Sequence, residues 1–197
     1  RASGKSNGEY IAHTQAGKHA HKSIMYHSHF SFYFSGISRR WANELVRHHV
    51  GSNAEHEGSP SAESSRFCLI PGRYVVPIGI ASDEQMLVDY ENDMNECHQN
   101  YVNCVDRLTQ IYVGRHGKKP TGMDKKRVLE AASGMLPSSV ETHMGWTANA
   151  ASLVKMILER HDKDADLEAQ RFAQMLADIC YSHSPNLFFQ LKGVVNA

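Results

Sequence analysis

The sequence lacks two features: a long apolar run and an excess of charge of one sign. Lys plus Arg and Asp plus Glu both number 21, so the formal net charge is +0. No apolar run approaches the roughly 20 residues that cross a bilayer. Without a bulk positive field, nothing in the composition attracts nucleic acid, and any anion site must be local. We therefore expect neither a membrane nor a nucleic-acid partner.

Cysteine is scarce and scattered. The four thiols are Cys68, Cys97, Cys104 and Cys180, and no two form a CxxC pair. Cys97 and Cys104 are seven residues apart in a stretch with helical periodicity, and two helical turns separate them too widely for a disulfide. We interpret all four as reduced thiols of a cytoplasmic protein.

The chain length and the periodic segments predict one α+β domain. The 197 residues suit a single domain over 1–197, and the start at Arg1, without Met, suggests a missing N-terminal segment. Phe30, Phe32 and Phe34 alternate with polar residues, which predicts a half-buried strand over 24–34 that ends at Gly36. Helical and extended segments follow one another without a regular βαβ alternation, which favours an α+β fold.

Local signals predict several helix ends and one loop. Ser38 can cap a helix reaching His49, and residues 149–160 form a further helix. Ser82 and Gln85 have the spacing of a capping box before a long amphipathic helix that ends near Gly114. Residues 50–65 are rich in Gly, Ser, Asn, Glu and Pro, which is typical of a loop.

One stretch carries the pattern of an anion site. Arg47, His48 and His49 end the predicted helix, and a polar loop leads from them to Ser64-Ser65-Arg66-Phe67. Arginine makes planar, bidentate contacts with phosphate, and hydroxyls with backbone N–H groups can complete an anion nest. The stretch therefore predicts a site for a phosphorylated ligand. Alternatively, the three basic residues only cap a helix C-terminus, where positive charge is favourable.

These segments resemble the flavin-dependent thymidylate synthase family, whose signature has the form R-H-R-x-x-S-x-N-E-x-S-x-R-Y. The chain has Arg47-His48-His49-Val50-Gly51-Ser52 and, after a longer interval, Ser64-Ser65-Arg66-Phe67. His21 to His27 resembles the family's G-H-x-S-x-x-E-H. Leu136-Pro137, the run from Thr147 to Leu153, and Arg160 follow at family-like spacing. The resemblance spans nearly the whole chain.

The resemblance implies a fold, an assembly and a set of ligand contacts. The fold is a central mixed β-sheet flanked by helices, in a homotetramer with active sites at subunit interfaces. The implied flavin contacts are Ser3, Ser23, Arg47, His48, His49, Ser52 and Asn149. The implied contacts to the substrate nucleotide are Glu44, Arg47, Ser64, Ser65, Arg66, Phe67 and Arg160.

The implied reaction is methylation of C5 of the uracil ring in UMP or dUMP. The carbon comes from methylenetetrahydrofolate, and the reducing equivalents pass through FAD from NADPH. Two residues take catalytic roles, Arg160 against the pyrimidine ring and Ser64 as a polarising hydroxyl. A fixed cation at the ring oxygens stabilises the negative charge that must enter the ring.

Several positions depart from the family pattern. His49 replaces an arginine, and Ala151, Ser133 and Asp164 replace basic or flavin-contacting residues. The loop before Ser64 is longer, so that either Glu55 or Ala62 takes the family's acidic position. These changes favour the branch of the family that methylates UMP for nucleoside antibiotics, in which the site must accommodate a ribose 2'-hydroxyl. An ordinary dUMP-to-dTMP thymidylate synthase is the alternative.

Two other classes of function compete with the enzyme. The chain has 13 histidines, and on a strand His27 and His29 would share one face, as a metal pair could. However, there is no HExxH motif and no cluster of ligands at metal spacing, so no metal is expected. The second alternative is a non-catalytic relative that binds flavin or nucleotide, and the lost charges at positions 49, 133 and 151 favour it.

Overall fold

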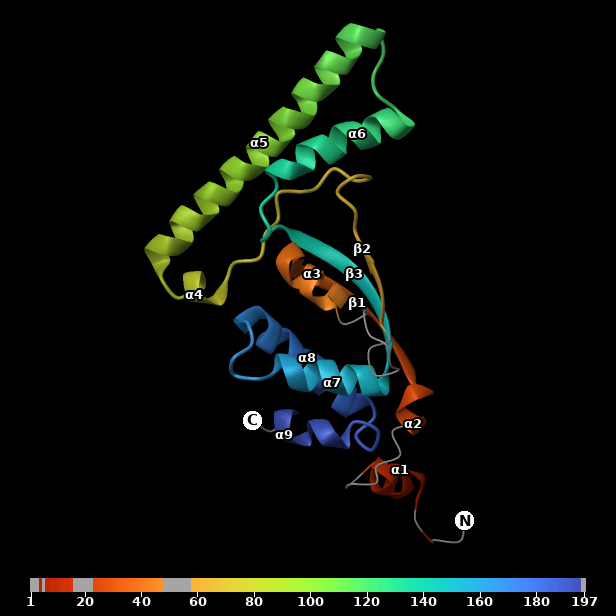
Figure 1. Cartoon of the computed structure of the whole chain (residues 1–197). Coiled ribbons are helices and arrows are strands. Elements are labelled where there is room, and N and C mark those ends of the chain that lie inside the picture. The colour runs from red at the N-terminus through yellow and green to blue at the C-terminus, as the bar shows by residue number, and fades with distance from the viewer. Residues whose placement is uncertain (1–3, 5, 16–22, 48–57, 196–197) are drawn as a thin grey trace. The chain divides into compact units, whose positions relative to one another are not determined.

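The computed structural model describes residue 4 and residues 6–15, 23–47 and 58–195 (Figure 1). The chain forms two compact units. Unit 1 comprises residues 1–33, 43–61 and 145–197, and unit 2 comprises 34–42 and 62–144. Helices and strands mix without regular alternation in the described residues, as expected for an α+β fold. The single domain over 1–197 stays a prediction.

A three-stranded sheet has the order β1-β3-β2, with β1 at His29–Ser38, β3 at Glu141–Asn149 and β2 at Gly58–Ala62. The Ser31 and Thr147 hydroxyls lie 2.8 Å apart, and the Gly36 N–H donates to the Glu141 side chain at 3.2 Å. Residue numbers therefore increase along β1 in the direction in which they decrease along β3, so these two strands run antiparallel. On the other edge of β3, the Glu63 N–H donates to the His143 carbonyl at 2.9 Å. The described strands are antiparallel, which corrects the expected mixed sheet.

The sheet also corrects three predictions about local structure. Strand β1 begins only at His29, after the short helix α2 (Ser23–Tyr26), and continues through Gly36, whose φ is 73°. His27 lies in the turn before the strand, so it does not share a strand face with His29. Residues 58–62 of the predicted loop form β2. Pairing with β3 makes this segment extended, and its polar composition alone does not predict a strand.

Unit 1 is built around helix α7 (Ala150–Arg160). Asn149 is fully buried and caps α7, because its Oδ1 accepts the Ser152 N–H at 2.8 Å. This confirms the predicted helix over 149–160. Helix α7 packs on α8 (Leu167–His183), and the chain continues through η3 (Phe189–Leu191) to α9 (Lys192–Val195). Helix α1 (Asn7–Gln15) also belongs to this unit.

Helix α3 (Arg39–Arg47) follows β1 and runs from unit 2 into unit 1. Its cap is the one that the sequence predicts, because the Ser38 hydroxyl accepts the Trp41 N–H at 3.0 Å. Trp41 and Leu45 bury one face of the helix, while Glu44 and Arg47 stand on the more exposed side. The helix thereby presents charged side chains near its C-terminal end.

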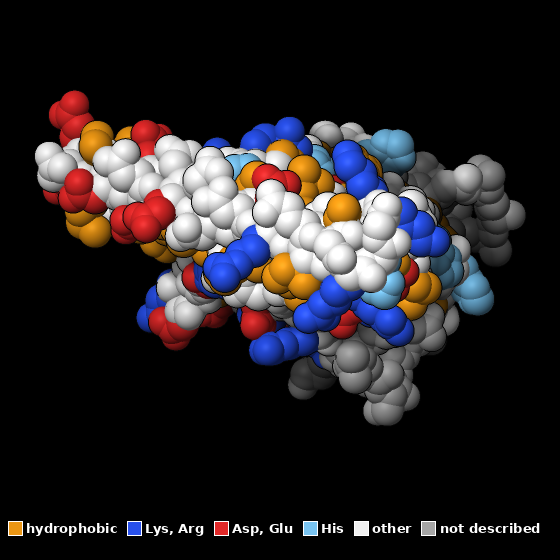
Figure 2. All heavy atoms as spheres, turned by 90° about the horizontal axis from the view of Figure 1, so that it is seen from above, with side chains coloured by type: hydrophobic (Ala, Val, Ile, Leu, Met, Phe, Trp, Pro, Cys, Tyr) orange, Lys and Arg blue, Asp and Glu red, His pale blue; other side chains and the backbone are white. Residues whose placement is uncertain are grey.

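Unit 2 is dominated by the helix α5 (Glu84–His116), which follows α4 (Ile78–Ala81). Asp83 caps α5 by accepting the Met86 N–H at 2.9 Å, so the predicted capping box of Ser82 and Gln85 is wrong. The helix ends at His116, because Gly117 takes the left-handed conformation with φ 68°. From Glu84 to Asp106 it carries acids and no Lys or Arg; acidic side chains gather at the left of Figure 2.

Helix α6 (Gly122–Ala132) and the turn η2 (Ser133–Met135) pack on α5. The core between them and the preceding loop contains Ile70, Tyr101, Ala132 and Val140, with Val102, Cys104, Val105, Leu108 and Leu136 against it. The amphipathic stripe of α5 is thus partly core. None of the described helices is long and apolar enough to cross a membrane.

Candidate functional site

Glu44 brings together two arginines that the sequence predicts as ligand contacts. The Glu44 carboxylate lies 2.9 Å from Arg47 Nη1, one turn along α3, and 3.8 Å from Arg160 Nη2, at the end of α7. All three residues belong to unit 1. Residues more than 110 positions apart in the sequence therefore form one charged cluster, which we call the Glu44 cluster.

The Glu44 cluster is only partly shielded from water. The side chain of Arg47 is 73% exposed, that of Glu44 35%, and that of Arg160 28%. Ion pairs at such exposure contribute about 0–1 kcal/mol, and at 3.8 Å the contact to Arg160 is an ion pair without hydrogen-bond geometry. Glu44 therefore orients the two guanidinium groups without binding them tightly, and an incoming anion can compete for them.

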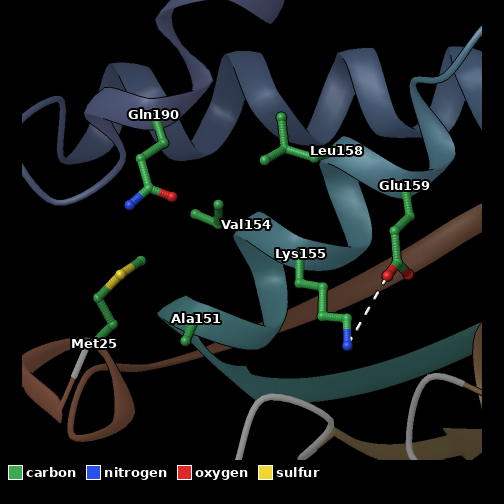
Figure 3. Close-up of a pocket in the computed structure, with 7 residues that line it drawn as sticks. All are labelled: Met25, Ala151, Val154, Lys155, Leu158, Glu159 and Gln190. Atoms are coloured by element: carbon green, nitrogen blue, oxygen red, sulfur yellow. Dashed lines mark ion pairs between the residues drawn. The ribbon is translucent and has the colours of Figure 1, made fainter. Parts of the chain in front are cut away.

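A pocket of about 320 Å³ lies along another face of α7 (Figure 3). It is lined by Met25, Ala151, Val154, Lys155, Leu158, Glu159 and Gln190. The five α7 residues are spaced three and four apart, so they share one face of the helix. Figure 3 shows Met25 of α2 and Gln190 of η3 extending toward Val154. The walls are mostly apolar, which suits a flat ring.

Two charged side chains are among the residues that line this pocket. Lys155 Nζ lies 3.9 Å from Glu159 Oε1, one helical turn away, and the two side chains are 32% and 49% exposed. Ala151 stands one turn before Lys155 on the same face. The structure therefore places a lysine at this pocket one turn from Ala151, the position at which the resemblance implies a basic residue.

Two predicted flavin contacts, Ser23 and Asn149, are close in sequence to residues that line the pocket. Ser23 begins α2, two residues before Met25, and is exposed. Asn149 precedes Ala151 by two residues, and its side-chain oxygen is used by the cap of α7. The cap explains why an asparagine suits this position even without a ligand. Contacts of either residue with a flavin stay predictions.

A second set of predicted residues forms a turn in unit 2. The N–H groups of Phe67 and Cys68 donate to the Ser64 carbonyl at 3.0 and 3.2 Å, and the Arg66 N–H donates to the Ser64 hydroxyl at 3.3 Å. Ser65 is buried at 9% exposure. We call residues 64–68 the Ser64 turn. Its hydrogen bonds fix the backbone and direct the side chains of Arg66 and Phe67 outward.

Helix α6 holds the Ser64 turn at two points. Arg66 Nε and Nη2 both contact Glu130 Oε2, at 2.9 and 2.6 Å. Lys126 Nζ lies 4.2 Å from the centre of the Phe67 ring, within the range of a cation–π contact. Because Lys126 and Glu130 are four residues apart, both point from one face of α6. The sequence shows this helical spacing, but nothing in it links these residues to the Ser64 turn.

Some of the remaining predicted positions lie outside the described residues, and the others lie within them. Ser3, His48, His49 and Ser52 lie outside the described residues, as does Glu55, one of the two candidates for the acidic position. Ala62, the other candidate, ends β2.

Two departures from the family pattern have local roles of their own. The Ser133 hydroxyl donates to the Glu130 carbonyl at 2.7 Å, and the Asp164 N–H donates to Asp162 at 2.9 Å. Within the described residues, no three His, Cys, Asp or Glu side chains come together as metal ligands could.

Comparison with known proteins agrees with the sequence motifs. The flavin-dependent thymidylate synthase of Clostridium tetani is 25% identical over 171 residues, which cover 86% of this chain and 65% of that protein. The enzyme of the same name from Mycolicibacterium vanbaalenii is 29% identical over 181 residues, 90% of this chain and 67% of that protein. The chain thus spans about two thirds of the length of these relatives.

The fold gives an independent match. A crystal structure of the flavin-dependent thymidylate synthase from Helicobacter pylori, complexed with FAD and dUMP, superimposes with a TM-score of 0.56 at 25% identity. The match covers 92% of this chain and 81% of that one. The family model described as thymidylate synthase complementing protein matches residues 2–186. The chain therefore belongs to this family, which is that of the flavin-dependent thymidylate synthases.

Proposed function

We propose that the protein methylates C5 of the uracil ring in dUMP, with carbon from methylenetetrahydrofolate and reducing equivalents that pass from NADPH through FAD. The observation that carries this proposal is the convergence of Arg47 and Arg160 on Glu44. The last turn of α7 also lines the pocket through Leu158 and Glu159. Support comes from the relatives, which are named for this activity, and from the Helicobacter pylori enzyme, which was solved with FAD and dUMP.

The described donors suit a flavin nucleotide. A guanidinium has five N–H donors, and the single carboxylate of Glu44 uses only part of this capacity at Arg47. Ser23 is exposed and lies two residues before the pocket residue Met25 in the chain. Both groups can donate to phosphate or ring oxygens. A pocket of about 320 Å³ accommodates a ring-sized part of the cofactor rather than a whole dinucleotide. When bound, the flavin supplies the reducing equivalents of the reaction.

Arg160 performs the electrostatic part of the reaction in this proposal. Carbon 5 of uracil is a poor nucleophile, and it reacts only as negative charge spreads into the ring. A cation held against the ring oxygens stabilises that charge most effectively when it is fixed beforehand. The last turn of α7 carries Arg160, and the Glu44 carboxylate, 3.8 Å away, orients its guanidinium. Ser64 would orient the substrate through its half-buried hydroxyl.

Arg66 provides the phosphate end of the substrate site in this proposal. Its planar guanidinium can take two phosphate oxygens at once, and the neighbouring Ser65 and Phe67 belong to the same turn. We propose further that the protein is a homotetramer and that several subunits contribute residues to each site. Arg66 and Arg160 then serve one substrate from different copies of the chain.

The substrate sugar has two candidates. The names of the relatives and the ligand of the solved enzyme favour dUMP. The longer interval between Ser52 and Ser64 favours acceptance of UMP as well, because a remodelled loop can satisfy the additional 2'-hydroxyl. Leaving that hydroxyl buried without a partner would cost roughly 1–3 kcal/mol, which disfavours UMP in an unmodified site by about 5- to 150-fold.

A methylation assay with both nucleotides tests the proposal. The purified protein is incubated with FAD, methylenetetrahydrofolate and NADPH, and with dUMP or UMP in parallel. We expect thymidylate from dUMP and a slower or comparable formation of 5-methyl-UMP from UMP. Protein that retains flavin but methylates neither nucleotide would identify a non-catalytic relative. Protein that retains no flavin would contradict the proposal at its first step.

A further inference from the structure

We propose that Glu130 is an internal competitor for the substrate phosphate: its carboxylate occupies the guanidinium of Arg66 until a nucleotide displaces it. The inference rests on the proposed function, in which Arg66 binds the phosphate of the substrate. It adds a residue from α6 that no sequence motif indicates.

The geometry of the pair makes Glu130 and a phosphate compete for the same edge of the Arg66 guanidinium. Arg66 presents Nε and Nη2, the two donors along one side of the guanidinium, to a single oxygen of Glu130. A phosphate bound through two parallel N–H···O bonds uses the same kind of paired donors. The carboxylate therefore occupies one bidentate edge of Arg66, and a nucleotide that takes this edge must first release Glu130.

The burial of the pair makes the exchange easy. The side chains of Arg66 and Glu130 are 48% and 50% exposed, so water screens their attraction and the pair adds little to stability. A phosphate monoester carries up to two negative charges and three strong acceptor oxygens, against one charge on the carboxylate. The phosphate therefore binds the guanidinium more strongly than Glu130 does.

Helix α6 also offers the released carboxylate a partner. Lys126 stands one helical turn before Glu130, at the spacing of an i,i+4 ion pair. In the structure its ammonium group lies over the ring of Phe67, next to Arg66 in the chain. The same helix face can therefore hold the Ser64 turn before binding and accept the Glu130 charge afterwards.

A pair of ligands that differ only in the phosphate tests this inference. Glu130→Gln removes the charge but keeps the size of the side chain and its helix propensity. We expect Glu130→Gln to bind dUMP roughly two- to fivefold more tightly than the original protein, the effect of removing one partly exposed competing charge. Binding of deoxyuridine, which has no phosphate, should not change. Titration calorimetry on the flavin-loaded protein measures both affinities.

The matched control is Glu96→Gln, which removes the same charge from an exposed position on α5 in the same unit. This variant should bind dUMP as the original protein does. A Glu130→Gln protein that binds dUMP equally or more weakly would overturn the inference, because Glu130 would then only position Arg66. Equal tightening for dUMP and deoxyuridine would overturn it too, since the effect would not involve the phosphate.

A third variant separates this inference from the proposed function. If Arg66→Ala loses affinity for dUMP while Glu130→Gln changes nothing, only the competition by Glu130 is wrong. If Arg66→Ala binds dUMP normally, Arg66 is not the phosphate ligand, and both proposals fail at this residue.

Discussion

Replacing Arg160 by Ala should abolish most turnover while leaving the fold almost unchanged. In the structure, the guanidinium contacts Glu44 at 3.8 Å, and Glu44 keeps its closer contact of 2.9 Å with Arg47 when Arg160 is truncated. No buried charge is therefore left alone. Loss of the pair with Glu44 costs at most about 1 kcal/mol of stability, which for a chain of this size lowers the melting temperature by about 2–4 °C.

The expected loss of activity is much larger than the loss of stability. Removing one fixed group that stabilises developing charge typically lowers kcat by about 10²- to 10³-fold. The kcat of Arg160→Lys should lie between those of the original protein and Arg160→Ala, because lysine keeps the charge but lacks the planar guanidinium. Steady-state methylation of dUMP measures kcat and KM, while flavin absorbance and thermal unfolding of the same preparation report on cofactor retention and folding.

Two outcomes would refute this reasoning. Turnover within a few-fold of the original protein would show that Arg160 does not face the reacting ring. A fall in melting temperature well beyond the expected range, or loss of the flavin in parallel with turnover, would show that Arg160 supports the structure rather than the chemistry.

Three further predictions concern the cap of α7, the thiols and the assembly. Asn149→Ala should lower the free energy of unfolding by about 0.5–2 kcal/mol, measured by denaturant unfolding; Asn149→Ser, which retains a capping oxygen without placing a charge at this buried position, should lose less, and equal losses would argue against the cap. Burial raises the pKa of Cys180 to about 12, so iodoacetamide at mildly alkaline pH should modify the exposed Cys68 well before Cys180, as followed by peptide mass spectrometry; similar rates would contradict the burial. Mixing inactive Arg66→Ala and Arg160→Ala subunits should restore about a quarter of the sites if different subunits supply the two arginines, whereas a mixture that stays inactive would exclude this arrangement.

Features determined by neighbours in the sequence were predictable. The caps of α3 and α7 depend on hydrogen bonds over three residues, so local patterns predicted Ser38 as a cap and a helix from residue 149. The start of α5 was missed by one residue, because Asp83 and Ser82 both have side chains able to cap it. Strand β2 was missed altogether, since only its pairing with β3 makes this polar segment extended.

In the candidate site, too, features set by local sequence were predictable and those set by contacts between distant segments were not. Family-like motifs identify Arg47, Arg66 and Arg160, but their partners come from packing between elements that are distant in the chain. Glu44 meets Arg160 only because α3 approaches the end of α7. Glu130 has no sequence signal, because its helical spacing from Lys126 is common to many surface helices and its contact with Arg66 is tertiary.

A crystal structure of the protein with FAD and dUMP would test the central claim most directly. We expect the uracil ring against the guanidinium of Arg160 in the Glu44 cluster, with the phosphate on Arg66 in place of Glu130. Density for the nucleotide at a position that touches neither arginine, in any copy of the chain, would contradict the account.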